Sequence, residues 1–254
     1  MILEKVYELA LPRLIGKKLK DVRIGLSLMA IELDDGSVGV TYVLKNEIGD
    51  VCSAIPNVEN LLGTPADEVA GWALTNNNVL TTALGLAVLN AVAEFDVLEL
   101  DKGSNNSDAV FSVAIKPTDT VGVIGHIGPV ISKLKGKVAR TLIFERGDNL
   151  PASVYNESRQ PELLPTCQLV FVTSSTLING TLENLLSDCP NARDIVMVGS
   201  STPLYPEAFS KTGVTTLAGT RWLSENKEAI FKAIGQSAGM KQLIKYGQKI
   251  SVKI

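Results

Sequence analysis

The feature that most constrains the fold is an apolar run that stops at glycines. Residues 121–129 read Val-Gly-Val-Ile-Gly-His-Ile-Gly-Pro and lead directly into a helical pattern over residues 129–134. A run that is apolar on both faces predicts a strand covered by helices, as in a parallel sheet. Because ligands bind outside the carboxyl ends of such strands, this turn predicts a binding crevice. The turn holds His126, the only histidine of the chain.

Strand and helix patterns alternate after residue 120. The further strand patterns cover residues 141–144, 169–173, 195–198 and 214–217. Helical patterns cover residues 180–187, 224–234 and 240–246. This alternation predicts an α/β domain of the Rossmann-like type, with three layers and a mainly parallel sheet. Residues 146–167 contain three prolines and predict a long loop with little helix, which is often functional.

The first hundred residues follow a different pattern. Residues 2–14 predict an amphipathic helix, and residues 22–33 and 38–44 predict an antiparallel hairpin across an Asp-Asp-Gly-Ser turn. A Thr-Pro-Ala-Asp start predicts a helix from residue 64 to about 74, and residues 79–95 predict a buried central helix.

The domain boundary is expected at a polar, glycine-containing stretch over residues 101–108, which is typical of a surface connection. We therefore predict an α+β domain over residues 1–107 and an α/β domain over residues 108–254. The apolar helix at 79–95 is compatible with a homodimer interface and equally with burial inside one subunit.

Charge and composition exclude several classes of protein. The net charge is −3, and Lys and Arg form no stripe, so a nucleic-acid partner is not expected. No apolar run is long enough to span a bilayer, and the first residues lack a signal-peptide pattern, so we expect a cytoplasmic protein without a membrane partner. Cys52, Cys167 and Cys189 stand singly, which argues against a disulfide framework or a self-contained zinc site and predicts small buried side chains.

The candidate ligand-binding residues follow the predicted strands, where small and polar side chains collect. They are Gly125, His126, Ile127 and Gly128 after the first strand, Glu145 after the second, Thr173, Ser174, Ser175, Thr176 and Asn179 after the third, and Gly199, Ser200, Ser201, Thr202 and Pro203 after the fourth.

Gly125 and Gly128 would let a ligand approach the first amides of the following helix, which predicts an anion pocket. The hydroxyl side chains of residues 173–176 and 200–202 serve either anion recognition or helix capping. The glycine spacing is Gly-x-x-Gly-x-x-Gly and lacks the dinucleotide fingerprint, so classical NAD binding is not expected. Glu145 stands where nucleotide-binding domains place a ribose-binding acid, and the alternative is a solvated carboxylate paired with Arg146.

His126 has four possible roles: a general base, a metal ligand, a hydrogen-bond donor to a bound anion, or a loop residue bonded to nearby backbone. The sequence identifies no partner acid for a base, and no Gly-x-Ser-x-Gly motif marks a nucleophilic serine. The catalytic residues, if any, are therefore unknown.

Two sequence strings carry a resemblance to a known family. Residues 173–186 read Thr-Ser-Ser-Thr-Leu-Ile-Asn-Gly-Thr-Leu-Glu-Asn-Leu-Leu, and residues 196–206 read Val-Met-Val-Gly-Ser-Ser-Thr-Pro-Leu-Tyr-Pro. With these strings the chain resembles, over nearly its whole length, the heavy-metal chelation family, which comprises domains of unknown function 364 and 4213. The resemblance implies an N-terminal domain similar to the first domain of enolases, a Rossmann-like domain, and a ligand cleft involving both.

The family resemblance implies binding or chelation of a heavy metal, or handling of a metal-containing cofactor. The cleft positions it implies are Gly125, Gly128, Glu145, Thr173, Thr176, Asn179, Gly199, Ser201 and Pro203, and it assigns no catalytic residue.

Two functions stay open. The first is a protein that binds a transition or heavy metal, or a metal complex, with His126 and Glu145 as candidate metal ligands and a cysteine brought near by folding or across a subunit interface. The second is an enzyme that acts on a nucleotide-like or anionic small molecule, with His126 as acid or base. Either function takes a small molecule or metal complex as the partner.

Overall fold

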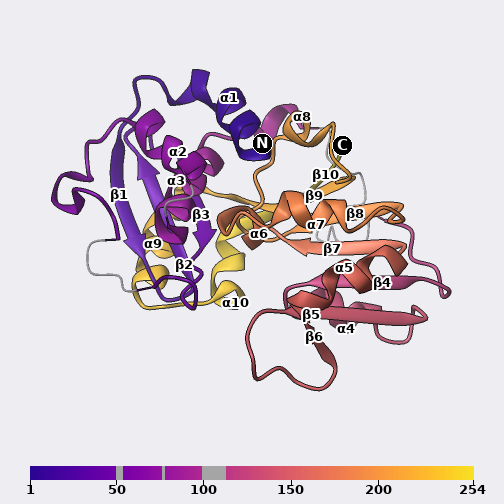
Figure 1. The fold of residues 1–254 in the computed structure, drawn as a ribbon. Helices are drawn as coiled ribbons and strands as arrows, with labels where there is room; N and C mark the ends of the chain where they lie inside the picture. The colour runs from indigo at the N-terminus through magenta and orange to yellow at the C-terminus, as the bar shows by residue number, and fades with distance from the viewer. Residues whose placement is uncertain (50–53, 76–77, 99–112) are drawn as a thin grey trace.

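The computed structural model describes residues 1–49, 54–75, 78–98 and 113–254. It contains a three-stranded sheet in the N-terminal part and a seven-stranded sheet in the C-terminal part, side by side (Figure 1). The expected surface connection at 101–108 and the predicted boundary at residue 107 lie outside the described residues, so the division into two domains stays a prediction.

The N-terminal sheet consists of β1 (Leu19–Ile24), β2 (Leu28–Leu33) and β3 (Val38–Tyr42), all antiparallel and following α1 (Ile2–Leu14). The prediction of one strand over residues 22–33 was wrong. The backbone N–H of Gly25 donates to the carbonyl oxygen of Leu28 at 2.9 Å and closes a tight turn. The apolar Leu26 hid this turn in the sequence, although its side chain is 64% exposed.

Helices α2 (Ala66–Thr75) and α3 (Val79–Ala91) pack together, and α3 covers one face of this sheet. Asn78 caps α3, because its side-chain oxygen accepts from the backbone N–H groups of Leu80 and Thr81. Residues 81–90 are all buried, which confirms the predicted central helix, although it ends four residues earlier than expected. Its apolar faces are covered within one chain, and the homodimer stays a prediction.

The C-terminal sheet confirms a mainly parallel α/β architecture. Its strands are β4 (Thr120–Ile124), β5 (Arg140–Glu145), β6 (Val154–Asn156), β7 (Leu169–Thr173), β8 (Asp194–Val198), β9 (Thr216–Trp222) and β10 (Gly247–Lys253). Their order is β10-β9-β8-β7-β4-β5-β6, and only β10 is antiparallel to its neighbour. Because β4 lies between β5 and β7, the loops after these strands meet at one edge of the sheet.

Short helices connect these strands. They are α4 (Gly128–Leu134), α5 (Gln160–Leu163), α6 (Ser175–Ile178), α7 (Leu182–Ser187), α8 (Pro206–Phe209), α9 (Lys227–Gly235) and α10 (Met240–Leu243). The expected loop at residues 146–167 holds β6 and α5, so it is more ordered than predicted. Strand β10 was not predicted at all.

The C-terminal segment returns to the N-terminal sheet. Helix α9 packs on β1 and β2, and one apolar cluster joins Leu28 and Val40 of that sheet to Phe231 and Ile234 of α9. The buried Glu32 side chain joins the two parts as well. Its carboxylate accepts from Lys227 Nζ at 2.6 Å and from Lys20 Nζ at 2.9 Å. The two sheets therefore share a core, which fixes the loops that face each other between them.

Within the described residues, no helix has both the length and the apolar character needed to cross a membrane.

Candidate functional site

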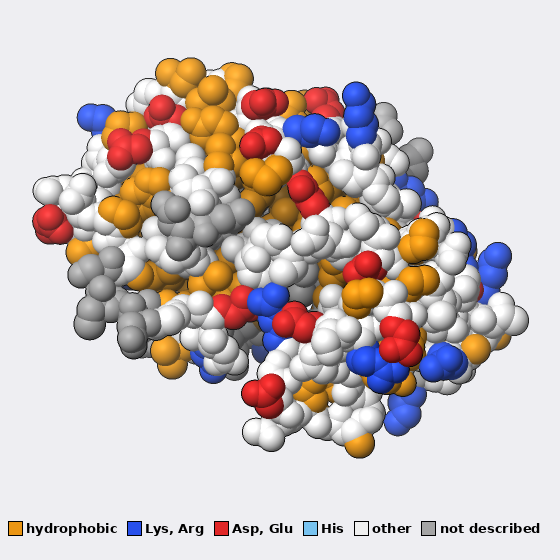
Figure 2. Space-filling model, in the orientation of Figure 1, with side chains coloured by type: hydrophobic (Ala, Val, Ile, Leu, Met, Phe, Trp, Pro, Cys, Tyr) orange, Lys and Arg blue, Asp and Glu red, His pale blue; other side chains and the backbone are white. Residues whose placement is uncertain are grey.

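A pocket of about 590 Å³ lies at the carboxyl edge of the parallel strands, between the two parts of the molecule. Residues that follow β4, β5, β7 and β8 line it together with residues of β3, β9, β10 and α10. In the space-filling view, acidic and basic side chains meet near the centre of the face, between the N-terminal part and strands β5 and β6 (Figure 2). The residues after the parallel strands thus meet a wall from the N-terminal sheet.

The glycine turn after β4 forms one wall of the pocket. Gly125, His126, Ile127 and Gly128 all line it, and the His126 side chain is exposed. Gly125 has a φ of +87°, and a Cβ there would lie 3.0 Å from Thr173 Cγ2. Both facts require glycine at this position. Gly128 opens α4 with nothing within 4 Å of an added Cβ, so its glycine keeps the pocket wall open.

Glu145 holds this turn in place. Its Oε2 accepts from the backbone N–H of His126 at 2.7 Å, and its Oε1 accepts from the backbone N–H of Arg146 at 3.2 Å. The carboxylate lines the pocket, but its oxygens are engaged with the loop of its own domain. The sequence left open an ion pair between Glu145 and the Arg146 side chain. In the described contacts that side chain pairs instead with Glu157 and Glu47.

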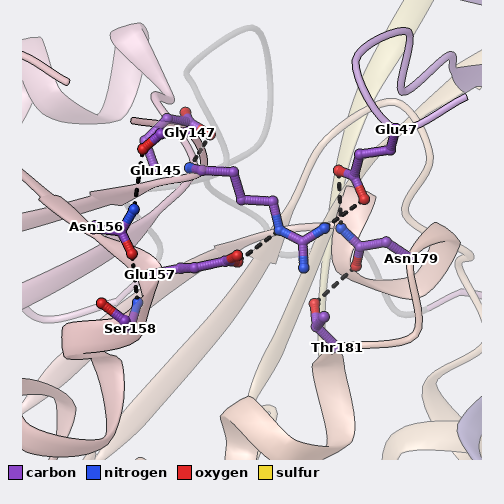
Figure 3. Close-up of polar contacts among 9 residues, drawn as sticks. Glu47, Glu145, Gly147, Asn156, Glu157, Ser158, Asn179 and Thr181 are labelled. Carbon is purple, nitrogen blue, oxygen red and sulfur yellow. Dashed lines mark hydrogen bonds and ion pairs between the residues drawn. The ribbon is translucent and has the colours of Figure 1, made fainter. Parts of the chain in front are cut away.

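Arg146 is the centre of a charged cluster that joins distant parts of the chain. Figure 3 labels its partners Glu47 and Glu157, together with Asn179. Arg146 Nε donates to Glu157 Oε2 at 2.6 Å, and its Nη1 donates to Glu47, which follows β3. The Asn179 amide lies between Glu47 and Thr181, with Asn179 Nδ2 3.3 Å from Glu47 Oε1. With its amide oxygen and nitrogen exchanged, Asn179 would accept from Arg146 Nη1 at 3.1 Å. Either orientation ties the N-terminal part to the loops after β5 and β7.

The hydroxyl residues after β7 divide into two groups. Thr173, Ser175 and Thr176 line the pocket, whereas Ser174 is fully buried outside its lining. Thr173 Oγ1 accepts from the backbone N–H of Ser175 at 3.3 Å, and Thr176 Oγ1 donates to the carbonyl oxygen of Thr173 at 2.8 Å. These hydroxyls therefore stabilise the turn as well as facing the pocket.

The loop after β8 is divided in the same way. Gly199 and Ser200 line the pocket, whereas Ser201, Thr202 and Pro203 are buried behind its wall. Ser201 Oγ accepts from the backbone N–H of Tyr42 at 2.8 Å, and Thr202 Oγ1 donates to the carbonyl oxygen of Ala218 at 3.1 Å. These two hydroxyls join the loop to β3 and β9, and the binding role expected of all five residues stays a prediction.

The lining residues that sequence reasoning missed include Tyr42, Glu47 and Glu157. None follows a predicted parallel strand, so the rule that selected Glu145 and Asn179 could not find them. Tyr42 and Glu47 reach the pocket only because the N-terminal sheet packs against the C-terminal one.

The described donors do not fit a site for a bare metal ion. Among these residues, no group of three or more His, Cys, Asp or Glu side chains is placed to hold one. Burial raises the pKa of Cys167 to about 11 and that of Cys189 to about 12, so both remain thiols at neutral pH. Cys52 lies outside the described residues. The metal role of His126 and Glu145 stays a prediction without a third described ligand.

Two family models match the chain, and both carry the description "Putative heavy-metal chelation". The model for domain of unknown function 4213 matches residues 7–93, and the model for domain of unknown function 364 matches residues 108–253. An uncharacterized protein of Methanocaldococcus jannaschii is 27% identical over 164 residues. The match covers 63% of this chain and 62% of that protein, so the chain spans less than two thirds of that relative.

Two solved structures share the fold. A protein of unknown function from Pyrococcus horikoshii is 23% identical with a TM-score of 0.79, and the match covers 100% of both chains. A protein of unknown function from Desulfitobacterium hafniense is 24% identical with a TM-score of 0.78, over 99% of this chain and 98% of that one. Both come from the family of domain of unknown function 364, and they confirm the α/β architecture.

Proposed function

Because the chain belongs to this heavy-metal chelation family, we propose that its pocket binds a metal complex of a small organic ligand rather than a bare metal ion. One observation carries the proposal: a pocket of about 590 Å³ without a cluster of three metal-binding side chains among the described residues. Pockets of about 300–1,000 Å³ are typical of small-molecule sites. A metal that enters this pocket would therefore bring most of its ligands with it.

The lining suits the outer atoms of such a complex. Ile124, Val198 and Ile250 offer apolar contacts, and the charged cluster around Arg146 offers hydrogen bonds at one end. Soft metal ions favour thiolate and imidazole ligands, and the described thiols are buried outside the pocket lining. The exposed His126 imidazole could occupy one open coordination position of a bound complex.

Equilibrium dialysis tests this proposal with Ni²⁺, Co²⁺ and Cu²⁺. Each ion is offered as the chloride and as its complex with citrate, histidine or 8-hydroxyquinoline-5-sulfonate. We expect at least one complex to bind at one per chain, while the bare ions bind weakly and without fixed stoichiometry. Stoichiometric binding of a bare ion at micromolar concentration would contradict the proposal.

A pocket-filling variant locates the binding. In Gly128→Leu the new side chain starts from a lining position where a Cβ meets nothing within 4 Å apart from its chain neighbours, so the substitution adds bulk at the pocket wall, and its thermal unfolding is checked because Pro129 follows. Gly71→Leu is the matched control, since Gly71 lies in α2 outside the pocket lining and also has nothing within 4 Å of an added Cβ. We expect Gly128→Leu to abolish binding of the complex and Gly71→Leu to retain it.

An enzyme that acts on a nucleotide-like or anionic small molecule is the second candidate function. It is favoured by the position of His126 on the pocket wall, with its backbone held by Glu145. This function predicts that a bound molecule is chemically converted by the wild-type protein and unchanged by His126→Ala. Binding without conversion in both proteins favours the first proposal.

A further inference from the structure

Two lysines line the pocket on the side away from the Arg146 cluster. Lys241 belongs to α10 and Lys249 to β10, and both side chains are exposed. Strand β10 is one edge of the sheet, and it is separated from β5 by five strand spacings, or about 24 Å. This wall of the pocket, which we call the lysine wall, is therefore distant from the charged side chains that follow β5.

A projecting pair of strands places Lys249 on this wall. Strand β8 ends at Val198, which pairs with Ala218, so residues 219–222 of β9 continue past the end of β8. These residues pair with residues 247–250 of β10. Lys249 and Thr220 are direct partners across the pair, and side chains of direct partners lie on the same face. Because Thr220 also lines the pocket, the lysine wall offers a hydroxyl donor as well as ammonium groups.

The lysine wall carries positive charge, and the opposite wall carries surplus negative charge. Among the described lining residues, none of those from β9, α10 or β10 is acidic. On the opposite wall, Glu47, Glu145 and Glu157 line the pocket with the single guanidinium of Arg146, which leaves two negative charges in excess. The pocket therefore suits a molecule whose own charges are separated.

The glycine turn after β4 is a poorer place for an anion than the lysine wall. The backbone N–H of His126 already donates to the carboxylate of Glu145. Those of Ile127 and Gly128 donate to carbonyl oxygens of the turn itself, at 2.8 and 3.0 Å. A bound anion would have to displace these bonds and would also meet the negative charge of Glu145. The contacts of the turn thus favour the other wall.

We propose that Lys241 and Lys249 form a subsite for an anionic group, a carboxylate or a phosphate, on the organic part of the ligand. The subsite rests on the proposed function and names the class of ligand. Ammonium groups donate hydrogen bonds and accept none, so they pair with anionic oxygens. The bound complex then lies with its metal toward His126 and the carboxylates, and with its anionic group against the lysine wall.

Three naphthalene probes test the subsite: 2-naphthoate, 2-naphthyl phosphate and the neutral 2-naphthamide. Each is titrated into ¹⁵N-labelled protein without metal. Amide shifts of residues 219–221 and 240–250 report binding at the lysine wall, and those of residues 125–128 report binding at the glycine turn.

We expect at least one anion to bind at the lysine wall about tenfold more tightly than 2-naphthamide, and the tighter anion distinguishes carboxylate from phosphate. Equal affinities of all three probes, shifts confined to the glycine turn, or no shift with 10 mM of either anion would overturn the proposal.

Lys253→Gln is the matched control for Lys241→Gln and Lys249→Gln. Lys253 is an exposed residue of β10 outside the pocket lining, so its substitution changes the net charge equally. We expect each lining variant to weaken the anion about three- to fivefold and to leave 2-naphthamide unchanged, while Lys253→Gln binds both like the wild type. An equal loss in Lys253→Gln would assign the effect to net charge and overturn the proposal.

Thermal unfolding checks that each variant folds. Lys249 makes a further contact within the molecule, so Lys241→Gln alone decides the outcome if Lys249→Gln is less stable than the wild type.

The probes contain no metal, so the subsite and the proposed function fail separately. Anion binding at the lysine wall without any bound metal complex would leave the subsite intact and remove the metal. A metal complex that binds equally to the wild type and to Lys241→Gln would remove the subsite alone.

Discussion

Asp119 offers a sharp test of the packing at the amino edge of the C-terminal sheet. Its carboxylate is 2% exposed and accepts from Arg193 Nη1 at 2.8 Å and Arg193 Nη2 at 2.7 Å. The backbone N–H of Lys116 donates to the same carboxylate at 2.8 Å. These contacts tie the start of β4 to the start of β8. Asp119→Asn would remove the negative charge. Its side-chain NH₂ group would also face an N–H donor of Arg193 or Lys116 in place of an acceptor.

The cost can be worked from these contacts. Removing one partner of a buried ion pair costs about 3–5 kcal/mol. Arg193 is 30% exposed and also lies 3.4 Å from Asp194, so the lower end applies. We expect Asp119→Asn to lower the free energy of unfolding by about 3 kcal/mol, or the melting temperature by about 6–12 °C for a chain of this length. Urea and thermal unfolding measure both quantities.

The stabilisation by Asp119 depends on pH in a direction that its pKa shift determines. Hydrogen bonds from Arg193 hold the pKa of Asp119 below its ordinary value, although burial acts in the opposite direction. The stabilisation is thus fully present above the unfolded pKa of about 4 and is lost as the pH falls through the lower native pKa. The difference between wild type and variant should be constant from pH 6 to 8 and shrink below about pH 4.

Glu162→Gln is the control, because Glu162 and its partner Arg159 are both exposed, and this variant should unfold like the wild type. A loss below about 1 kcal/mol in Asp119→Asn, or one that persists undiminished at pH 3, would refute the reasoning.

Three further predictions concern the core and the thiols. A Cβ at Gly39 would lie 1.9 Å from the carbonyl oxygen of Ala87, so Gly39→Ala should cost about 3 kcal/mol or more in urea unfolding; wild-type stability would contradict this close approach of β3 and α3. Burial raises the pKa of Glu32, but hydrogen bonds from its two lysines lower it further, so it lies below its ordinary value. Because both lysines are partly exposed, Glu32→Gln should cost about 1.5–3 kcal/mol at pH 7 and less as the pH falls below about 4, and an equal cost at pH 3 would be inconsistent with the pairing. Because burial raises the pKa values of Cys167 and Cys189, both should resist iodoacetamide at pH 7.5 in a Cys52→Ser background and react after unfolding in urea; rapid labelling of the native protein would show that they are accessible.

The parallel strands could be predicted because their signal is local. β4, β5, β7 and β8 contain the apolar runs predicted at residues 121–124, 141–144, 169–173 and 195–198. Strands that are covered by helices on both faces must be apolar on both faces. The apolar runs in the sequence therefore predict these strands directly. The glycine turn could also be predicted locally. Gly125 has a positive φ and closely approaches Thr173, and both features favour glycine, which is visible in the sequence.

The missed elements depend on tertiary contacts. β10 (Gly247–Lys253) alternates buried and exposed positions only weakly, and its seven residues pair with β9 as an antiparallel edge strand. The last strand pattern, at residues 214–217, lies only partly within β9 (Thr216–Trp222). The sequence also lacks a turn signal between β9 and β10, because helices α9 and α10 separate the two paired strands.

The candidate site shows the same limit. The strand-end rule selected Glu145 and Asn179, which do line the pocket. Glu47 enters only through the packing of the N-terminal sheet and its contact with Arg146, and no local pattern marks it.

The most direct test of the central claim is native mass spectrometry with elemental analysis on protein purified without an affinity tag or chelators. The proposed function predicts that metal and an organic mass are retained together, at one of each per chain, and that both are lost in Gly128→Leu. A bare metal ion retained without an organic mass, and unaffected by Gly128→Leu, would contradict it.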